Sequence, residues 1–362
     1  MLDPHSNYMD PKSFHNMQVQ TRGEFGGLGV EVTMEDGRVK VVAPLDDTPA
    51  AKAGVMTNDI ITRLDNEAVQ GLTLNQAIDK MRGPVGTNVR LTLERKGLEK
   101  PIDVTIERAV IRVRPVRWRT LGGDIGYIRI AQFNEQTTLA LKNALADLQT
   151  QIAPDKLHGY VLDLRNNPGG LLDQVISVAD EFLDSGEILS TRGRKPEYTK
   201  SYYAKAGDST NGRPIIVLIN GGSAAGSEML AGALQDNKRA TVIGTRSFGK
   251  GTVETIFPLG GDWGAVRLTT SRNYTPSGHS IQAQGIVPDI EVLQEVPNAT
   301  KAESKSESAL RGHLPGQSEE HSGSQSYVPP NPTDDKALNM AVDLLRGVIV
   351  NSAFPPKTSG PK

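Results

Sequence analysis

Two turns and one lysine carry the side chains that could perform chemistry in this sequence. Residues 220–236 read NGGSAAGSEMLAGALQD, so an apolar run ends in a small-residue turn and an amphipathic helix follows. The turn holds the hydroxyls of Ser223 and Ser227. A serine hydroxyl becomes a nucleophile when a neighbouring base removes its proton. The nucleophile-elbow pattern G-x-S-x-G is missing from this turn, which argues against a Ser-His-Asp triad.

A lysine offers the base that such a nucleophile would need. Residues 245–254, TRSFGKGTVE, place Lys250 between glycines directly after a predicted strand. Glycines allow close backbone approach, so the lysine can be held in a crowded pocket. A lysine amine has a pKa of about 10.4, and lowering it to about 7 or 8 by desolvation costs roughly 4 kcal/mol. The alternative is an ordinary surface lysine in a turn.

A third stretch could stabilise negative charge. Residues 161–174, VLDLRNNPGGLLDQ, end a predicted strand and enter a helix through Gly169 and Gly170. Amide groups at a glycine-rich turn and a helix N-terminus can form an oxyanion hole. The pattern fits an ordinary strand-to-helix turn equally well, so these residues alone leave both interpretations open.

These stretches lie in a part of the chain that alternates strands and helices. From about residue 121, apolar strands alternate with helices of about 10 to 15 residues, which predicts a largely parallel sheet covered by helices. Catalytic residues in such folds usually follow the carboxyl ends of strands. Residues 26–108 predict a separate β-rich module with two helices. The basic stretch 112–119, RVRPVRWR, predicts a connecting strand with one solvated face, and contact with nucleic acid or anionic lipid is the alternative.

The C-terminal part changes composition. Residues 296–333 lose apolar periodicity and are rich in Ser, Glu, Lys, Gly and Pro, which predicts a flexible linker. Residues 334–362 restore helical spacing and predict a C-terminal helix and tail, with Asp334 or Asp335 as the cap.

Composition excludes several classes of function. The 362 residues carry 40 basic and 42 acidic side chains, so the net charge of -2 gives no global attraction for nucleic acid or an anionic membrane. The absence of cysteine removes thiol nucleophiles and disulfides and is compatible with an oxidising compartment. The six histidines lack metal-ligand spacing, so we expect no metal and no cofactor. We find no apolar run of membrane-spanning length and no opening signal peptide, as in a mature or trimmed product.

Taken together, the quoted stretches resemble the carboxyl-terminal processing peptidases, which are S41-type serine proteases with a Ser-Lys dyad and a PDZ domain. The resemblance implies a bacterial protein. It runs through LDPHSNYMDPKSF, MQVQTRGEFGGLGVEV, DLRNNPGGLL, GTRSFGKGTVETIFPL and TPSGHSIQAQGIVPDI, in the family's order. The implied architecture is an α/β protease core (ClpP/crotonase-like) with an inserted β-rich PDZ domain. The implied bounds are an N-terminal protease segment at 1–25, the PDZ domain at 26–108 and the protease core at 109–295.

The resemblance identifies a position where the expected nucleophile is absent. The family's turn usually reads N-x-x-S-A-S-x-S-E, and its middle serine is the nucleophile. In this sequence the outer serines match Ser223 and Ser227, while the middle one falls on Ala225. Three explanations stay open: a deliberate Ser→Ala substitution, a natural pseudoenzyme, or attack by Ser223 or Ser227 instead.

The other catalytic positions are carried over in the same way. The general base falls on Lys250, and the oxyanion donors fall on the amides of Gly169 or Gly170 and of Gly226. Glu254 stands where the family often has glutamine, and on a strand it shares a face with Lys250. An ionised carboxylate there favours the charged lysine and opposes the neutral form that a base needs. A protonated or differently oriented Glu254 avoids this conflict.

The PDZ resemblance implies a peptide groove. Consecutive amides of its carboxylate-binding loop receive a terminal carboxylate, while the next strand pairs with the peptide. The loop residues are Gly26, Gly27, Leu28, Gly29 and Val30. Apolar recognition falls on the following helix, with candidates Ala77, Ile78 and Met81. We expect one of these three to line the groove, because the module also needs its own core.

The activity implied by the resemblance is endoproteolysis of extracytoplasmic proteins near apolar C-termini. The implied partners are protein or peptide substrates, an adaptor protein and further copies of the chain in a homo-oligomer. The implied location is the periplasm or another extracytoplasmic compartment, with membrane association through a missing N-terminal segment. The chain as written would be catalytically inactive. The competing hypothesis is a natural pseudoprotease that acts as a PDZ peptide-binding scaffold.

Overall fold

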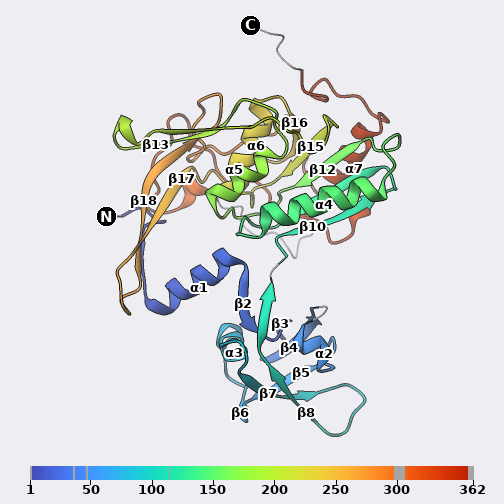
Figure 1. Cartoon of the computed structure of the whole chain (residues 1–362), viewed down its shortest axis with the longest axis vertical. Helices are drawn as coiled ribbons and strands as arrows, with labels where there is room; N and C mark the ends of the chain where they lie inside the picture. Colours follow the sequence, from blue (N-terminus) through green and yellow to red (C-terminus); the bar gives the residue numbers. More distant parts are fainter. Residues whose placement is uncertain (1, 36, 46–47, 113, 297–305, 358–362) are drawn as a thin grey trace. The chain divides into compact units, whose positions relative to one another are not determined.

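The computed structural model describes residues 2–35, 37–45, 48–112, 114–296 and 306–357. The chain divides into two compact units. The smaller unit comprises Gly23–Val113, and the larger comprises Met1–Arg22 together with Arg114–Lys362. The smaller unit is therefore an insertion within the chain of the larger one (Figure 1).

A six-stranded sheet forms the body of the smaller unit. Its order is β3-β4-β5-β7-β8, with β6 paired to β5, and every pair is antiparallel. The elements are β3 (Val30–Glu35), β4 (Arg38–Pro44), α2 (Pro49–Lys52), β5 (Ile60–Leu64), β6 (Glu67–Ala68), α3 (Leu74–Met81), β7 (Asn88–Glu94) and β8 (Ile102–Glu107). Thr73 and Gln76 form a reciprocal capping box that begins α3.

Alternating burial explains why these residues form a sheet with one covered face. In β7, Val89, Leu91 and Leu93 are buried, while Asn88 and Arg90 are exposed. The unit extends beyond the predicted 26–108 because the segments entering and leaving it pair with each other. These segments are β2 (Glu24–Gly27) and β9 (Ala109–Arg112). A change of composition along the chain does not reveal this pairing.

The larger unit contains a second six-stranded sheet, of order β10-β11-β12-β15-β16-β19. Its strands are β10 (Val116–Leu121), β11 (Ile125–Ile130), β12 (Gly159–Asp163), β15 (Ile215–Ile219), β16 (Ala240–Gly244) and β19 (Ile290–Glu291). Only the pair of β10 with β11 is antiparallel, so the predicted largely parallel sheet is present. In β10, Val116 is buried while Arg117 and Arg119 are exposed, as expected for a strand with one solvated face.

Helices cover both faces of this sheet. The helices are α4 (Thr137–Gln151), α5 (Leu172–Asp180), α6 (Gly226–Asp236) and α7 (Lys336–Leu345). Tyr160 and Leu162 of β12 pack into the cluster that includes residues of α4, α5 and α6, whereas Val161 packs into the cluster that includes α7. Figure 1 shows α4 beside β10 and α5 beside α6. Burial on both faces explains why every residue of β12, β15 and β16 is buried.

A further sheet joins the N-terminal residues to the rest of the larger unit. Its order is β1-β18-β13-β14, and β17 also pairs with β18. The elements are β1 (Asn7–Met9), α1 (Pro11–Arg22), β13 (Glu187–Gly193), β14 (Lys200–Tyr203), β17 (Thr252–Pro258) and β18 (Ala265–Tyr274). The antiparallel pairing of β1 with β18 places the N-terminal segment in the larger unit.

Residues 306–333 differ from the predicted flexible linker, because they are hydrogen-bonded to the larger unit. The carbonyl of Gln325 accepts from the amide of Gly221 at 2.9 Å and from Oγ1 of Thr245 at 2.8 Å. The carbonyl of Ser326 accepts from Nδ2 of Asn220 at 2.9 Å. Hydrogen bonds to backbone carbonyls need no apolar periodicity, so composition did not reveal this attachment. Residues 297–305 of the predicted linker lie outside the described residues.

The C-terminal helix is anchored at its start. Asp335 caps α7 by accepting from the amide of Leu338 at 3.1 Å, and Nη1 of Arg165 also donates to it at 2.8 Å. The helix is thereby tied to the turn that follows β12.

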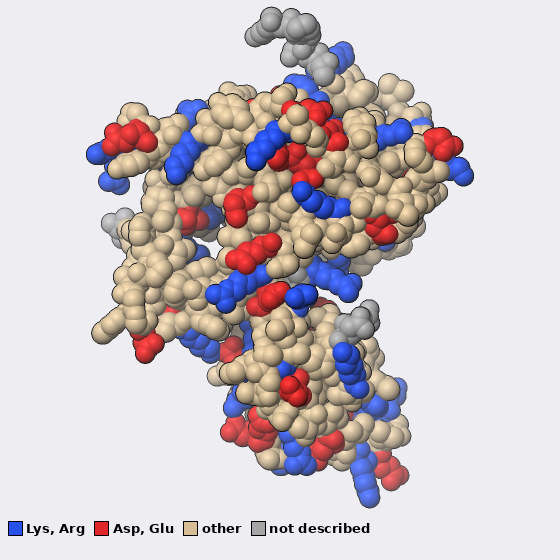
Figure 2. All heavy atoms as spheres, in the orientation of Figure 1, with Lys and Arg blue, Asp and Glu red and all other residues tan. Residues whose placement is uncertain are grey.

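The surface carries charges of both signs. On the face shown in Figure 2, basic and acidic side chains are interspersed on each unit. Among the described residues, no helix combines the length and the apolar character needed to cross a membrane.

Candidate active site

The turn between β15 and α6 holds its two serines in buried hydrogen bonds. Oγ of Ser223 donates to the carbonyl of Leu164 at 2.9 Å and accepts from the amide of Asn220 at 3.0 Å. Oγ of Ser227 lies 2.9 Å from the carbonyl oxygens of both Asn167 and Ala224. Both serines are fully buried. Their hydroxyl protons are already shared with backbone carbonyls, which argues against either serine as the nucleophile.

Ala225 occupies the point of the turn in a strained conformation. Its φ is 49° and its ψ is -108°, a region that residues with a side chain rarely adopt. Such a conformation costs on the order of 1–3 kcal/mol and is concentrated at functional sites. Ala225 is the N-cap of α6 and is only 8% exposed. This backbone conformation fixes the direction of the Cβ of Ala225 at the start of α6.

The turn after β12 lies directly against Ala225. The amide of Ala224 donates to the carbonyl of Asn167 at 2.9 Å, which holds the two turns together. Gly169 has a φ of 100°, and a Cβ on it would lie 2.7 Å from the amide nitrogen of Gly226. Only glycine permits this approach.

The three predicted oxyanion donors are not equivalent. The amide of Gly169 donates to Oδ1 of Asn167 at 2.8 Å, so it is already engaged. Among the described residues, the amides of Gly170 and Gly226 have no hydrogen-bond acceptor. Gly226 also begins α6, where an N-terminal amide favours negative charge. These two amides are therefore the better candidates for binding an oxyanion.

Glu228 is a site residue that the sequence analysis missed. It is fully buried in the first turn of α6 and accepts four hydrogen bonds. The donors are the amides of Ala225 (2.8 Å), Gly249 (2.6 Å) and Lys250 (2.8 Å) and Oγ of Ser247 (2.5 Å). Burial raises the pKa of Glu228 to about 7, although these hydrogen bonds act in the opposite direction.

Glu228 joins Ala225, the predicted nucleophile position, to the lysine loop, residues 248–251. One carboxylate oxygen accepts from the amides of both Ala225 and Lys250. A glutamate three residues after a helix N-cap is the capping-box pattern, which becomes recognisable when position 225 is a serine. Because this sequence has alanine at position 225, the capping-box pattern is incomplete and does not point to Glu228.

Lys250 pairs with Glu254, although Lys250 lies before β17 and the register of β17 shifts between Val253 and Glu254. Nζ of Lys250 lies 2.6 Å from Oε2 of Glu254, and the two side chains are 20% and 13% exposed. The other carboxylate oxygen of Glu254 is buried without a partner among the described residues. The lysine is therefore a mostly buried amine rather than a free surface lysine.

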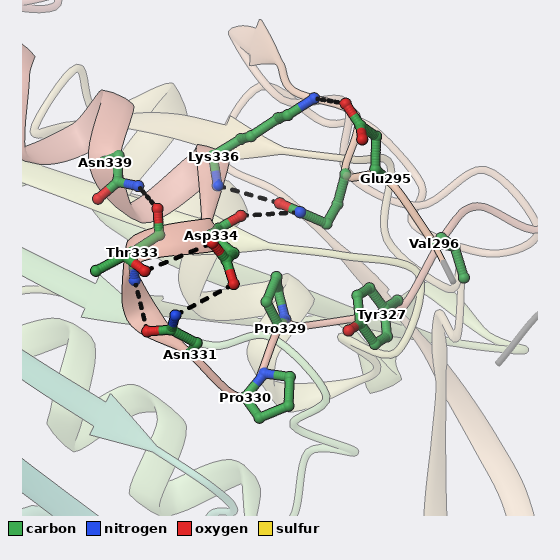
Figure 3. Close-up of a pocket in the computed structure, with 11 residues that line it drawn as sticks. Glu295, Val296, Tyr327, Pro329, Pro330, Asn331, Thr333, Asp334, Lys336 and Asn339 are labelled. Carbon is green, nitrogen blue, oxygen red and sulfur yellow. Dashed lines mark hydrogen bonds and ion pairs between the residues drawn. The ribbon is translucent and has the colours of Figure 1, made fainter. Parts of the chain in front are cut away.

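The described residues contain no group of three or more metal-ligating side chains that could hold a metal ion. A hollow of about 680 Å³ lies elsewhere, beside the start of α7. Figure 3 shows its lining, which includes Tyr327, Pro329 and Pro330 and the ion pair of Lys336 with Glu295 at 2.7 Å. None of the predicted catalytic residues lines it.

Comparison with known proteins assigns both units. The profile of peptidase family S41 matches residues 124–292, and the PDZ domain profile matches residues 26–106. A carboxy-terminal-processing protease of Bartonella bacilliformis is 57% identical over 359 residues, covering 98% of this chain and 82% of that protein. The chain belongs to peptidase family S41.

A second relative agrees with this family, and a solved structure agrees with the fold. A carboxyl-terminal-processing protease of Synechocystis is 38% identical over 299 residues, covering 81% of this chain and 68% of that protein. A solved S41 protease structure from Bacteroides fragilis has a TM-score of 0.53 at 17% identity, covering 90% of this chain and 84% of that chain. At that identity it supports the fold alone. The α/β protease core with an inserted PDZ domain is thus present in this S41 peptidase.

The PDZ domain of this S41 peptidase keeps one sheet edge available for a peptide. β3 is an edge strand of its sheet. Of the predicted loop residues, Gly26 and Gly27 lie in β2 and Val30 begins β3, so only Leu28 and Gly29 connect the two strands. The carbonyls of Leu28 and Gly29 accept from Ala50 and Leu45 at 2.8 Å each, which fixes the loop from within. The side chain of Leu28 is buried in the core. A PDZ domain can bind a C-terminal segment by adding it to such an edge.

The three groove candidates on α3 have different environments. Ala77 and Met81 are 0% and 5% exposed and belong to the core of the PDZ domain. Ile78 is partly buried and packs against that core. Ile78 therefore remains the groove candidate, while Ala77 and Met81 pack in the core, which the expectation of one groove residue among the three allows.

Proposed function

We propose that this S41 peptidase is a serine endopeptidase of the carboxy-terminal-processing type in which Ala225 stands in place of the nucleophilic serine. The strained backbone of Ala225 carries this proposal. A methyl group at position 225 gives no reason for a strained backbone. A catalytic hydroxyl at this position would give one, because backbone strain is concentrated at functional sites. The neighbouring amides and the linked lysine loop support the same interpretation.

The proposed reaction needs only groups of this chain. With a serine at position 225, Lys250 removes the hydroxyl proton and the resulting oxygen attacks the scissile carbonyl. The amides of Gly170 and Gly226 stabilise the oxyanion of the tetrahedral intermediate. The intermediate collapses with cleavage of the C–N bond, and the leaving amine takes the proton that Lys250 had removed from the hydroxyl. Lys250 then takes a proton from water, the resulting hydroxide attacks the acyl-enzyme, and the carboxylic acid product leaves as the serine hydroxyl is regenerated. The ion pair with Glu254 must loosen or lose its charge before the lysine acts as a base, because only the neutral amine accepts a proton.

The proposed substrates are extracytoplasmic proteins with apolar C-termini. The PDZ domain and the names of the relatives support recognition of a peptide terminus, with Ile78 contacting an apolar side chain. The proposed location is the periplasm or another extracytoplasmic compartment, in keeping with the absence of cysteine. Binding to an adaptor protein, membrane association and assembly into a homo-oligomer are part of the same proposal.

Restoring the serine tests the proposal. We expect Ala225→Ser to hydrolyse an unfolded protein substrate, because in an unrelated serine protease loss of the nucleophile costs on the order of 10⁶ in kcat. The matched control is Ala225→Ser with Lys250→Ala, which should return to the background rate. A natural pseudoprotease scaffold is the second candidate. Binding of C-terminal peptides without any turnover by Ala225→Ser would favour it.

A further inference from the structure

A fully buried carboxylate lies in the segment whose composition predicts a linker. Glu307 has no exposed surface. Nε2 of His5 lies 3.0 and 2.9 Å from its two carboxylate oxygens, and Nε2 of Gln282 donates to Oε1 at 3.1 Å. Burying a carboxylate is costly unless it is paired and hydrogen-bonded. The arrangement therefore binds the N-terminal segment and the C-terminal segment to the residues around Gln282.

The same residue holds both ends of the lysine loop, residues 248–251. The backbone amide of Glu307 donates to the carbonyl of Phe248 at 3.1 Å. Through its side chain, Glu307 holds Gln282, whose Oε1 accepts from the amide of Gly251 at 3.0 Å. Lys250 lies between these two points of attachment.

We propose that Glu307 is a positioning residue for Lys250. Glu228 holds the amides of Gly249 and Lys250 from the side of the nucleophile turn. Glu307 and Gln282 hold the two ends of the same loop, at Phe248 and Gly251. The position of the base therefore depends on contacts from both ends of the chain. This inference rests on the proposed function, because the position of the loop matters for catalysis only when Lys250 is the base.

Loss of the Glu307 contacts should displace Lys250 and should not affect peptide binding by the PDZ domain. The bonds of Glu307 described above go to the loop, to Gln282 and to His5, and none goes to the PDZ domain. Loss of the bridge should leave peptide binding by the PDZ domain unchanged while the lysine loop becomes mobile. A small displacement of a catalytic group lowers the rate of the chemical step strongly.

Hydrogen exchange in the chain as it stands tests the positioning without requiring activity. We expect Glu307→Ala to speed amide exchange within residues 248–251 by about tenfold, while exchange in α5 stays unchanged. Glu307→Gln should have a smaller effect, because its side chain can still accept from Gln282 and donate to neutral His5. The matched control is Glu319→Ala, since Glu319 is exposed in the same segment. Unchanged exchange in the loop, or an equal increase over the whole larger unit, would overturn the proposal.

A kinetic measurement in the Ala225→Ser background completes the test. We expect Glu307→Ala to lower kcat by about tenfold or more and to leave KM within about threefold, with the Glu319→Ala control unchanged. A change in KM alone would contradict a positioning role. If Ala225→Ser proves inactive, the proposed function fails while the exchange measurement still decides whether Glu307 positions the loop.

Discussion

Nζ of Lys250 lies 2.6 Å from Oε2 of Glu254 at the position where the base of this S41 peptidase is proposed. A carboxylate at this distance engages the amine of Lys250 in an ion pair. In the Ala225→Ser background we expect Glu254→Gln to raise kcat/KM severalfold, because Nζ of Lys250 is then released from the ion pair and can accept a proton from the introduced hydroxyl. Glu319→Gln serves as the control. Lower activity of Glu254→Gln at every pH would show that the carboxylate assists the base.

The strain at Ala225 predicts a stabilising substitution. Ala225→Gly should raise the free energy of unfolding by about 1 kcal/mol. Glycine adopts positive φ without steric cost, and the strain relieved is larger than the cost of ordering the more flexible glycine on folding. Denaturant unfolding measures the difference. Ala231→Gly in the middle of α6 is the matched control and should destabilise by about 1 kcal/mol. Equal losses for both variants would show that the turn is not strained.

The close approach of the two turns predicts that Gly169 cannot be replaced. A Cβ at Gly169 would lie 2.7 Å from the amide nitrogen of Gly226 and 2.9 Å from Cβ of Ala225. We expect Gly169→Ala to cost about 2 kcal/mol or more and to abolish activity in the Ala225→Ser background. Gly207→Ala controls for positive φ, because Gly207 has a φ of 138° and open space around it. Similar losses of stability in both variants would show that the positive φ alone causes the loss, without a contribution from the close approach of the turns.

The buried carboxyl of Glu228 predicts a pH-dependent stability. Burial raises the pKa of Glu228 from its ordinary 4.5 to about 7, so the folded chain holds this proton more tightly than the unfolded chain. Its contribution, about 3 kcal/mol, is fully present below about pH 4.5 and is lost as the pH rises toward about 7. Glu228→Gln does not titrate, so its Tm should fall less than that of the parent chain over this range. Parallel Tm profiles would contradict the raised pKa.

The different environments of Ile78 and Met81 predict opposite outcomes for two similar substitutions. Ile78→Asp should weaken binding of a peptide with an apolar C-terminus by about tenfold and leave the fold intact. Met81→Asp should unfold the PDZ domain, because it buries a charge in the core. Calorimetric titration and circular dichroism separate the two effects. Unaltered binding by a folded Ile78→Asp variant would remove Ile78 from the groove.

Particular residues show where prediction from the sequence failed. Glu228 was missed because its capping-box partner is an alanine in this chain, so the local pattern is incomplete. Glu307 was missed because its neighbours are rich in Ser, Glu and Lys, and its partner His5 lies at the other end of the chain. Ala77 and Met81 share a helical stripe with Ile78, and periodicity alone does not distinguish a core position from a groove position.

The sequence by itself determined the family, the alternation of strands and helices in the parallel sheet, and the candidate positions of the nucleophile and the base. These follow from local patterns, since a turn of small residues after a strand and a lysine between glycines are recognisable in a few consecutive residues. The tertiary structure decided which amides remain free for an oxyanion and which carboxylates hold the lysine loop. Those properties depend on hydrogen bonds between residues far apart in the chain, and folding alone brings such donors and acceptors within reach of each other.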